Sequence, residues 1–179
     1  MAATAPCIVD TIDSPVGPLT AAAHPDGVCL LEFASPDRLD AEMASLRRWF
    51  GTDPVPGRHP HLDRLREELS AYFAGALKQF TVPLVAPGTP FQERVWGELR
   101  RIPYGETRSY EELARAVGVV RAPRAVGRAN GTNRIAIVIP CHRVVNKNGG
   151  LGGYGGLLWR KEFLLRLEGA NPCGSLPLC

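Results

Sequence analysis

Residues 135–150 include the side chains that are the clearest candidates for catalysis in the chain. An apolar run ends at a proline, and Cys141, His142 and Arg143 follow directly. A cysteine is a nucleophile only as its thiolate, and an ordinary pKa of about 8.5 leaves little thiolate at neutral pH without a nearby cation, base or helix N-terminus. His142 and Arg143 are the candidates beside it in sequence. The alternative is a small buried cysteine that packs in the core.

Two further features are candidates for the same site. Glu168 falls at the predicted C-terminal end of the last helix, where the helix dipole disfavours a carboxylate by about 0.3–1 kcal/mol. A histidine that needs an orienting acceptor would compensate, and a solvated glutamate is the alternative. Residues 153–156, Gly-Tyr-Gly-Gly, offer unblocked backbone N–H groups that suit an oxygen gaining negative charge. A flexible turn is the other interpretation of that loop.

The second half of the chain also concentrates positive charge. The net charge is +3, and five arginines fall within a span that contains no acidic residue: Arg121, Arg124, Arg128, Arg134 and Arg143. Such a surface could face phosphates or simply be solvated. Small residues beside Arg124 and Arg128 would let a helix backbone approach a partner closely. Nucleic-acid recognition fits this helix, with packing of a poor helix as the alternative.

The elements that must position these residues follow from local signals. Thr89 with Gln92, and Ser109 with Glu112, are capping boxes that each begin a helix. A further short helix runs from Pro123 to residues 130–131, which gives a helix-turn-helix. Beyond the cysteine, residues 148–149 predict a hairpin or wing. The last helix places three apolar residues on one face: Trp159, Phe163 and Leu167.

The first half has a different pattern. Residues 8–33 predict three short antiparallel strands, with Gly17 and Gly27 in the turns. Amphipathic helices at 39–50 and 62–73 are expected to cover the sheet. We therefore predict four parts: an N-terminal α/β domain at 1–80, a linker at 81–88, a C-terminal domain at 89–170 and a tail at 171–179.

Composition narrows the class of protein. A chain of 179 residues that is 45% hydrophobic can bury a core, and its apolar stretches are far shorter than the roughly 20 residues of a membrane span. The chain has five cysteines with no CxxC pair, and no basic region leads an apolar one at its start. We expect a soluble protein of a reducing, intracellular compartment, without a disulfide framework.

Several blocks together resemble one protein family. PCHRV follows RAVGRANGTN, with SYEELA upstream and GYGG, WRKEFLL and EG downstream. In this order they resemble the O6-alkylguanine-DNA alkyltransferases, which are DNA-repair methyltransferases. The resemblance covers residues 91–169, and TIDSPVGPLT and LSAYFAG extend it more loosely into the first half.

The resemblance implies a fold and a partner. The expected fold is a ribonuclease-H-like α/β domain with an antiparallel sheet, followed by a winged-helix-like domain that holds the site. The helix-turn-helix would enter the minor groove of double-stranded DNA, and the target guanine would be flipped out. Arg124 matches the residue that fills the vacated stack. The same DNA-binding helix contributes Ala125, Gly127 and Arg128.

The resemblance also implies roles for the site residues. Cys141 matches the alkyl acceptor, His142 the base that takes its proton through a water, and Glu168 the carboxylate that orients this histidine. Asn133 matches the brace of the active-site turn, and Tyr110 a donor to the leaving guanine. The pocket matches extend to the carbonyls of Cys141 and Val144, which read the exocyclic amine, and to a wall formed by Tyr154, Gly155 and Gly156. The thioether product would make each molecule act once.

The sequence departs from the family pattern at three positions. Gly155 replaces a serine of some members, and Leu157 replaces a third glycine, which predicts a narrower or stiffer pocket. Pro123 precedes Arg124 where a small residue is usual, and we expect DNA binding to survive.

Some members of the family bind a structural zinc. Here the candidate ligands are Cys7, His24 and Cys29, and with no fourth ligand we expect ordinary strand residues and no cofactor.

Three alternatives remain at this stage. A lesion sensor of the same fold would bind damaged DNA without repairing it, but such sensors replace the acceptor cysteine, which Cys141 retains. A helix-turn-helix redox regulator would usually carry an additional zinc domain. A cysteine hydrolase would leave the arginine-bearing helix without a purpose. We therefore predict a cytoplasmic, monomeric alkyltransferase.

Overall fold

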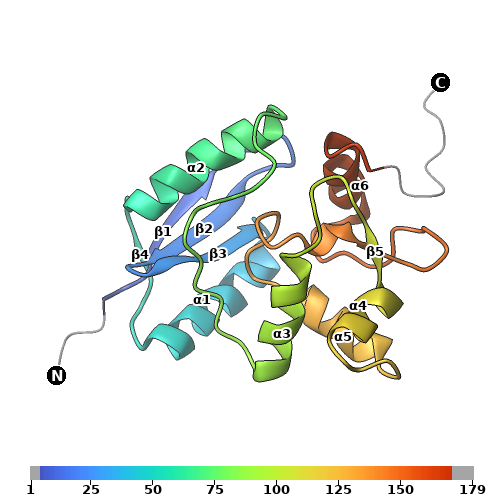
Figure 1. The fold of residues 1–179 in the computed structure, drawn as a ribbon. Coiled ribbons are helices and arrows are strands. Elements are labelled where there is room, and N and C mark those ends of the chain that lie inside the picture. The colour runs from blue at the N-terminus through green and yellow to red at the C-terminus, as the bar shows by residue number, and fades with distance from the viewer. Residues whose placement is uncertain (1–4, 171–179) are drawn as a thin grey trace. The chain divides into compact units, whose positions relative to one another are not determined.

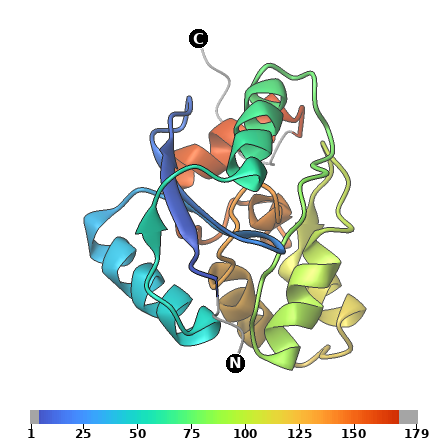
Figure 2. The same ribbon diagram turned by 90° about the vertical axis from the view of Figure 1, so that its left-hand side faces the viewer.

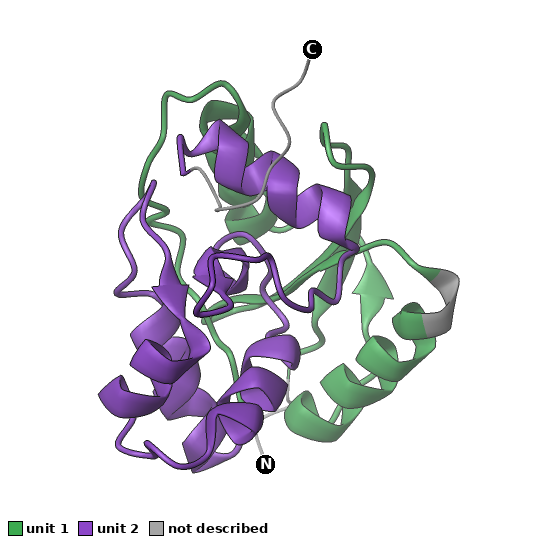
Figure 3. Cartoon of the chain, turned by 90° about the vertical axis from the view of Figure 1, so that its right-hand side faces the viewer, with its two compact units in different colours: residues 1–87 green, residues 88–179 purple. Residues whose placement is uncertain are grey.

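The computed structural model describes residues 5–170, apart from the side chains of residues 36 and 37. The chain divides into two compact units, residues 1–87 and 88–179 (Figure 3). The predicted tail at 171–179 lies outside the described residues. In the part of the chain that the structure describes, none of the helices has both the length and the apolar character that a membrane crossing requires.

Unit 1 is built on a four-stranded sheet. β1 (Ile8–Ile12), β2 (Leu19–His24) and β3 (Gly27–Phe33) form the predicted antiparallel meander. A fourth strand, β4 (Val55–Pro56), pairs in parallel with β1, which gives the order β3-β2-β1-β4. No element was predicted between the helices at 39–50 and 62–73, because two residues are too few to show a strand pattern.

The outer edge of β3 is covered by residues of the predicted linker. Val28 N donates to Pro83 O at 2.8 Å, and Val85 N donates to Val28 O at 2.9 Å. Gly27 makes this approach possible, since a Cβ atom there would lie 2.6 Å from Pro83 O. Residues 83–85 of the predicted linker therefore pack along the edge of the sheet.

Two helices cover the sheet of unit 1, as predicted. α1 (Pro36–Phe50) and α2 (Pro60–Phe73) lie on opposite faces (Figures 1 and 2). Leu46 of α1 packs in a cluster with Cys7 and Cys29, and α2 buries Leu62 and Leu65 among others. Each helix starts with a proline, whose missing N–H costs nothing in the first turn.

Unit 2 begins with three packed helices, α3 (Pro90–Leu99), α4 (Tyr110–Ala116) and α5 (Pro123–Gly131). Both predicted capping boxes are present, at Thr89 with Gln92 and at Ser109 with Glu112. Trp96 Nε1 donates to Ala129 O at 2.9 Å and ties α3 to the end of α5. α4 and α5 form the predicted helix-turn-helix.

A short sheet connects the helices to the cysteine segment. β5 (Arg108–Ser109) pairs in parallel with β6 (Val144–Val145), which directly follows the turn η1 (Cys141–Arg143). Residues 146–150 then form a tight turn in which Asn146 N donates to Gly150 O at 2.8 Å. No return strand follows this turn in the described residues, so the predicted hairpin or wing is here a turn only.

The buried face of the last helix differs from the predicted one. α6 (Leu158–Leu167) leaves Trp159 50% exposed, although the apolar spacing placed Trp159, Phe163 and Leu167 together on one face. The residues that α6 buries are Lys161, Leu164 and Leu165, and Glu168 is buried at its end. The apolar spacing did not identify the buried face because it gave no role to Lys161, whose partners are backbone carbonyls inside the unit.

Candidate active site

Cys141 lies at the end of a buried, irregular run of chain. Residues 135–140 form turns and no regular strand, and the Cys141 residue is only 6% exposed. Val138 N donates to Ala136 O at 2.8 Å across Ile137, whose φ is 71°. This γ-turn has the rare positive φ, which is strained for a β-branched residue. A second tight bond, Cys141 N to Ile139 O at 2.8 Å, sets the start of η1.

Asn133 holds these turns together. Its Nδ2 donates to Ile139 O at 2.8 Å and to Ile135 O at 3.4 Å, and its Oδ1 accepts from Ile135 N at 3.1 Å. One buried side chain thus replaces the backbone partners that a strand would have supplied. Asn130 of α5, which the sequence analysis used only as a helix end, donates to Cys141 O at 3.4 Å.

His142 points away from solvent toward Glu168. Its Nε2 lies 2.9 Å from Glu168 Oε1, and both side chains are fully buried. The other ring nitrogen, Nδ1, is buried and has no hydrogen-bond partner in the described structure. Burial lowers the pKa of His142, and the nearby Arg143 and Lys161 charges act in the same direction against the opposing effect of Glu168. A lowered pKa favours the neutral form of the imidazole at neutral pH.

The Glu168 carboxylate is ionised despite its burial. Burial alone would raise its pKa, but hydrogen bonds from His142 and Arg143, and their charges, outweigh this and lower it. An ionised carboxylate can only accept, so Nε2 of His142 carries the hydrogen and Nδ1 presents a lone pair. This tautomer suits His142 to take a proton from a thiol.

Arg143 does not serve as the simple neighbouring cation that its sequence position indicated. Its guanidinium donates to both oxygens of Glu168, through Nε at 2.8 Å and Nη2 at 2.9 Å, and through Nη1 to Ile102 O at 2.6 Å. Glu168 is thus shared between two consecutive residues of η1. Sequence reasoning missed this role because nothing local links residue 143 to residue 102 or 168.

Lys161 is a second residue that sequence reasoning missed. Its side chain is 0% exposed, and Nζ donates to Val144 O and Leu151 O. Nζ also lies 6.0 Å from the ring centroid of Tyr154. Burial lowers the pKa of Lys161 to about 8, and the charge of Cys141 partly opposes that change. The Val144 carbonyl, a predicted guanine reader, therefore already accepts one hydrogen bond.

Tyr110 is the first residue of α4, and its side chain reaches from the helix-turn-helix to the glycine loop. Its hydroxyl donates to Gly153 O at 3.4 Å, and its ring is 3.7 Å from where a Cβ atom on Gly127 would lie. Burial raises the pKa of Tyr110, and the charge of Cys141 raises it further, so the phenol stays protonated as a donor. Gly156 follows in the loop, and its carbonyl accepts from Arg160 at 3.2 Å. Tyr154 is half-buried, and Gly155 is exposed.

Leu157 departs from ordinary backbone geometry. It has φ 73° and ψ 143°, a region that glycine occupies far more readily than other residues, and it is 59% exposed. Its neighbours Leu158 and Trp159 are also half exposed. The replacement of glycine noted in the sequence thus falls at a strained position before α6.

The outer side of α5 carries the predicted DNA-binding residues. Arg124 and Arg128, one turn apart, are exposed, and neither forms an ion pair within the described residues. Ala125 and Gly127 are half-buried, while Val126 is buried beneath them. An open hollow of about 300 Å³ lies beside this helix, lined by Thr89, Phe91, Gln92, Ala125, Arg128, Ala129 and Thr132.

The predicted zinc ligands lie in unit 1. Cys7 and Cys29 are close, with their sulfurs 3.8 Å apart, and both are buried. His24 instead stacks on Phe50 at 4.7 Å, with Nδ1 3.1 Å from Asp26. Across the described residues, no three His, Cys, Asp or Glu side chains are arranged to hold a metal ion.

Comparison with known proteins places both units in one family. Residues 8–86 match the ribonuclease-like domain, and residues 90–170 the DNA binding domain, of 6-O-methylguanine DNA methyltransferase. The match confirms the predicted fold class.

Individual relatives cover nearly the whole chain. The methylated-DNA–protein-cysteine methyltransferase of Mycobacterium tuberculosis is 46% identical over 94% of this chain and 96% of its own length. The constitutive enzyme of that name from Bacillus subtilis is 42% identical over 88% of this chain and 93% of its own. A crystal structure of M. tuberculosis OGT in complex with DNA has a TM-score of 0.78 at 45% identity, covering 90% of this chain and 92% of that chain.

Proposed function

Because the chain belongs to the 6-O-methylguanine DNA methyltransferase family, we propose that it repairs DNA by transferring the alkyl group from O6 of an alkylated guanine to Sγ of Cys141. The observation that carries the proposal is the geometry of the His142 imidazole beside Cys141: its Nε2 lies 2.9 Å from Glu168 Oε1, and its buried Nδ1 has no hydrogen-bond partner among the described residues. Relatives named for this activity support it.

The reaction can be written from the groups of this site. Nδ1 of His142 takes the thiol proton, through a water, and the sulfur attacks the alkyl carbon in line. The S–C bond forms as the C–O6 bond breaks, and the electron pair leaves with guanine. Tyr110 donates a hydrogen bond to the departing base, and the carbonyls of Cys141 and Val144 accept from its exocyclic amine. The thioether has no easy reverse step, so each molecule acts once.

The helix-turn-helix supplies the proposed contact with DNA. We infer that α5 enters the minor groove of a duplex, that Arg124 takes the place of the flipped base, and that Arg128 faces the phosphates. Two features of α5 support this: its exposed arginines form no internal ion pairs among the described residues, and its small residues permit close approach. Action as a cytoplasmic monomer stays a prediction from the sequence.

The deciding experiment measures the mass of the intact protein. After incubation with a duplex that holds one O6-methylguanine, we expect each chain to gain one CH₂, located on the peptide that contains Cys141. Cys141→Ala should gain none. The other described cysteines, Cys7 and Cys29, are buried in unit 1 and serve as internal controls. Binding without transfer would instead favour a lesion sensor, and multiple turnovers would rule out the stoichiometric reaction.

A further inference from the structure

The guanidinium of Arg143 forms a bidentate ion pair with the carboxylate of Glu168. Nε donates to Oε2 at 2.8 Å and Nη2 to Oε1 at 2.9 Å, so the carboxylate plane is fixed as well as its position. Oε1 is the same oxygen that accepts from His142. The orientation of the imidazole thus depends on a carboxylate whose orientation depends on Arg143.

The loop at residues 102–105 contacts both Arg143 and the C-terminal end of α6, which carries Glu168. Ile102 O accepts from Arg143, and the Tyr104 ring centroid lies 5.9 Å from the guanidinium carbon. Tyr104 donates to Leu167 O at 3.0 Å, and Gly105 N approaches Glu168 Oε2 at 3.4 Å. Gly105 has φ 80°, and a Cβ atom there would lie 2.8 Å from Glu168 O. The loop therefore fixes both Arg143 and the end of α6.

The charges of the assembly bear directly on His142. A buried carboxylate without a second partner would favour a protonated imidazole, because the ion pair would offset the burial of its charge. Here the positive charge of Arg143 already balances Glu168. The other charged or titratable groups near this assembly are Lys161, Cys141 and Tyr104. The positive charge of Lys161 also disfavours protonation of His142.

We propose that Arg143 is a positioning residue that keeps Glu168 ionised and aligned, so that His142 rests as the neutral Nε2–H tautomer with Nδ1 ready to accept the thiol proton. This deepens the proposed alkyl transfer and rests on it. In this proposal Arg143 acts through its hydrogen bonds to Glu168, and Glu168 in turn acts on His142.

Nitrogen-15 NMR of the imidazole rings tests the protonation state directly. The chain has four histidines, and His142 is assigned by its loss in His142→Gln. The full chain is used with Cys141→Ala, so that the acceptor does not titrate. We expect His142 to show a protonated Nε2 and a bare Nδ1 at neutral pH, and to remain neutral well below the ordinary histidine pKa of about 6.5. A protonated His142 at neutral pH would overturn the proposal without any Arg143 variant.

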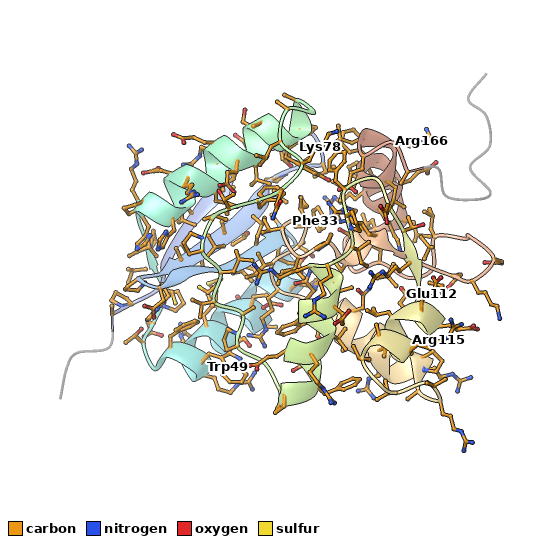
Figure 4. The ribbon with its side chains drawn as sticks, viewed as in Figure 1. Phe33, Trp49, Lys78, Glu112, Arg115 and Arg166 are labelled. Carbon is orange, nitrogen blue, oxygen red and sulfur yellow. The ribbon has the colours of Figure 1, made fainter. Side chains whose placement is uncertain are left out.

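Substitution of Arg143 then separates charge from packing. In Arg143→Gln the pKa of His142 should rise. When Cys141 is present, the same substitution should lower the single-turnover rate on a methylated duplex about tenfold. That fall is part of the 10²–10⁴-fold rate enhancement that a general base usually contributes. Arg143→Lys keeps the charge but not the bidentate contact, so it should restore a neutral His142 and only part of the rate. The control Arg166→Gln removes an exposed arginine of α6 that pairs with Glu162 at 2.7 Å, and should change neither (Figure 4).

The outcomes distinguish this proposal from the proposed function. An unchanged His142 titration in Arg143→Gln would overturn the role of Arg143, and so would an equal shift in Arg143→Lys. Failure of the unmodified protein to acquire a methyl group would overturn the alkyl transfer while leaving the titration result intact. A fall in rate with no change in the imidazole signals would assign Arg143 a purely structural role and reject the proposal.

Discussion

Arg143 contrasts with Arg124 and Arg128, although all three arginines belong to unit 2. Arg143 is 7% exposed and makes three hydrogen bonds to groups of its own unit, whereas Arg124 and Arg128 are exposed and form no ion pair among the described residues. A buried guanidinium must be satisfied within the fold, so its energetic effect is on stability and on the groups it contacts. An exposed one contributes little to folding and remains available to an external anion. The two groups should therefore respond to substitution in different assays.

The largest effect is expected at the buried group. Glu168→Ala leaves Arg143 and His142 without their shared acceptor, and loss of one partner of a buried ion pair costs about 3–5 kcal/mol. We expect a loss of that size in the free energy of unfolding, measured in urea, together with near-complete loss of alkyl transfer. Glu162→Ala, which breaks the more exposed pair with Arg166 on the same helix, should cost about 1 kcal/mol or less. Equal costs for the two variants would contradict the contrast.

The pH dependence of stability follows from the same carboxylate. The folded pKa of Glu168 lies below its unfolded value of about 4.3, so its contribution is fully present above that value and is lost as the pH falls toward the folded pKa. In Glu168→Gln this titration is absent. The stability difference between the parent protein and this variant should therefore shrink steadily as the pH is lowered below about 4. A constant difference across that range would mean that Glu168 is not held ionised by its partners.

Substitution of the exposed Arg124 should change the repair of DNA and leave the stability of the fold nearly unchanged. Arg124→Ala removes the proposed occupant of the vacated stack and leaves the pocket intact. We expect repair of duplex DNA to slow by about tenfold or more, since stacking contacts contribute about 1–3 kcal/mol, while reaction with free O6-alkylguanine and the urea midpoint stay nearly unchanged. Arg115→Ala, on the exposed side of α4 where Arg115 pairs with Glu111 at 3.8 Å, is the matched control. Equal losses on duplex and free base would reject the role of Arg124.

The smallest effect is expected at Leu157. Leu157→Gly should relieve a strained backbone that costs of order 1–3 kcal/mol, offset by about 0.5–1 kcal/mol of added freedom in the unfolded chain. The net gain should be about 1 kcal/mol, visible as a higher Tm. A side chain that narrows the pocket would also make this variant react faster with bulky O6-alkylguanines than the parent does. A lower Tm would show that the exposed leucine makes stabilising contacts.

Local signals in the sequence account for much of the fold. The capping boxes at Thr89 and Ser109, and the turn glycines of unit 1, act within a few residues and were predicted at the positions where they occur. β4 was missed because its partner strand lies 47 residues earlier in the chain (Ile8 pairs with Val55) and only two residues pair. The face of α6 was assigned wrongly for a related reason, since the partners of Lys161 are backbone carbonyls that no side-chain pattern reveals.

In the candidate site too, some residues could be predicted from the sequence and others depended on contacts between distant segments. The resemblance placed Cys141, His142, Glu168 and Asn133 together, and the structure brings the last three into the hydrogen bonds described above. Arg143 was considered only as a neighbour of the thiol, because sequence adjacency says nothing of direction. Its contacts with residues 102 and 168 depend on three separate segments meeting, which is the kind of information that a single sequence does not carry.

The shortness of η1 has a consequence for how this protein tolerates change in length. Three consecutive residues carry an acceptor thiol, an imidazole and a guanidinium, and two of them reach the same carboxylate. A single insertion or deletion within this turn would rotate each following side chain away from its partner, whatever residue was added. The exposed turn at residues 146–150, only a few residues later, has no such constraint. A library of one-residue insertions across 139–150 should therefore retain methyl transfer only beyond residue 145.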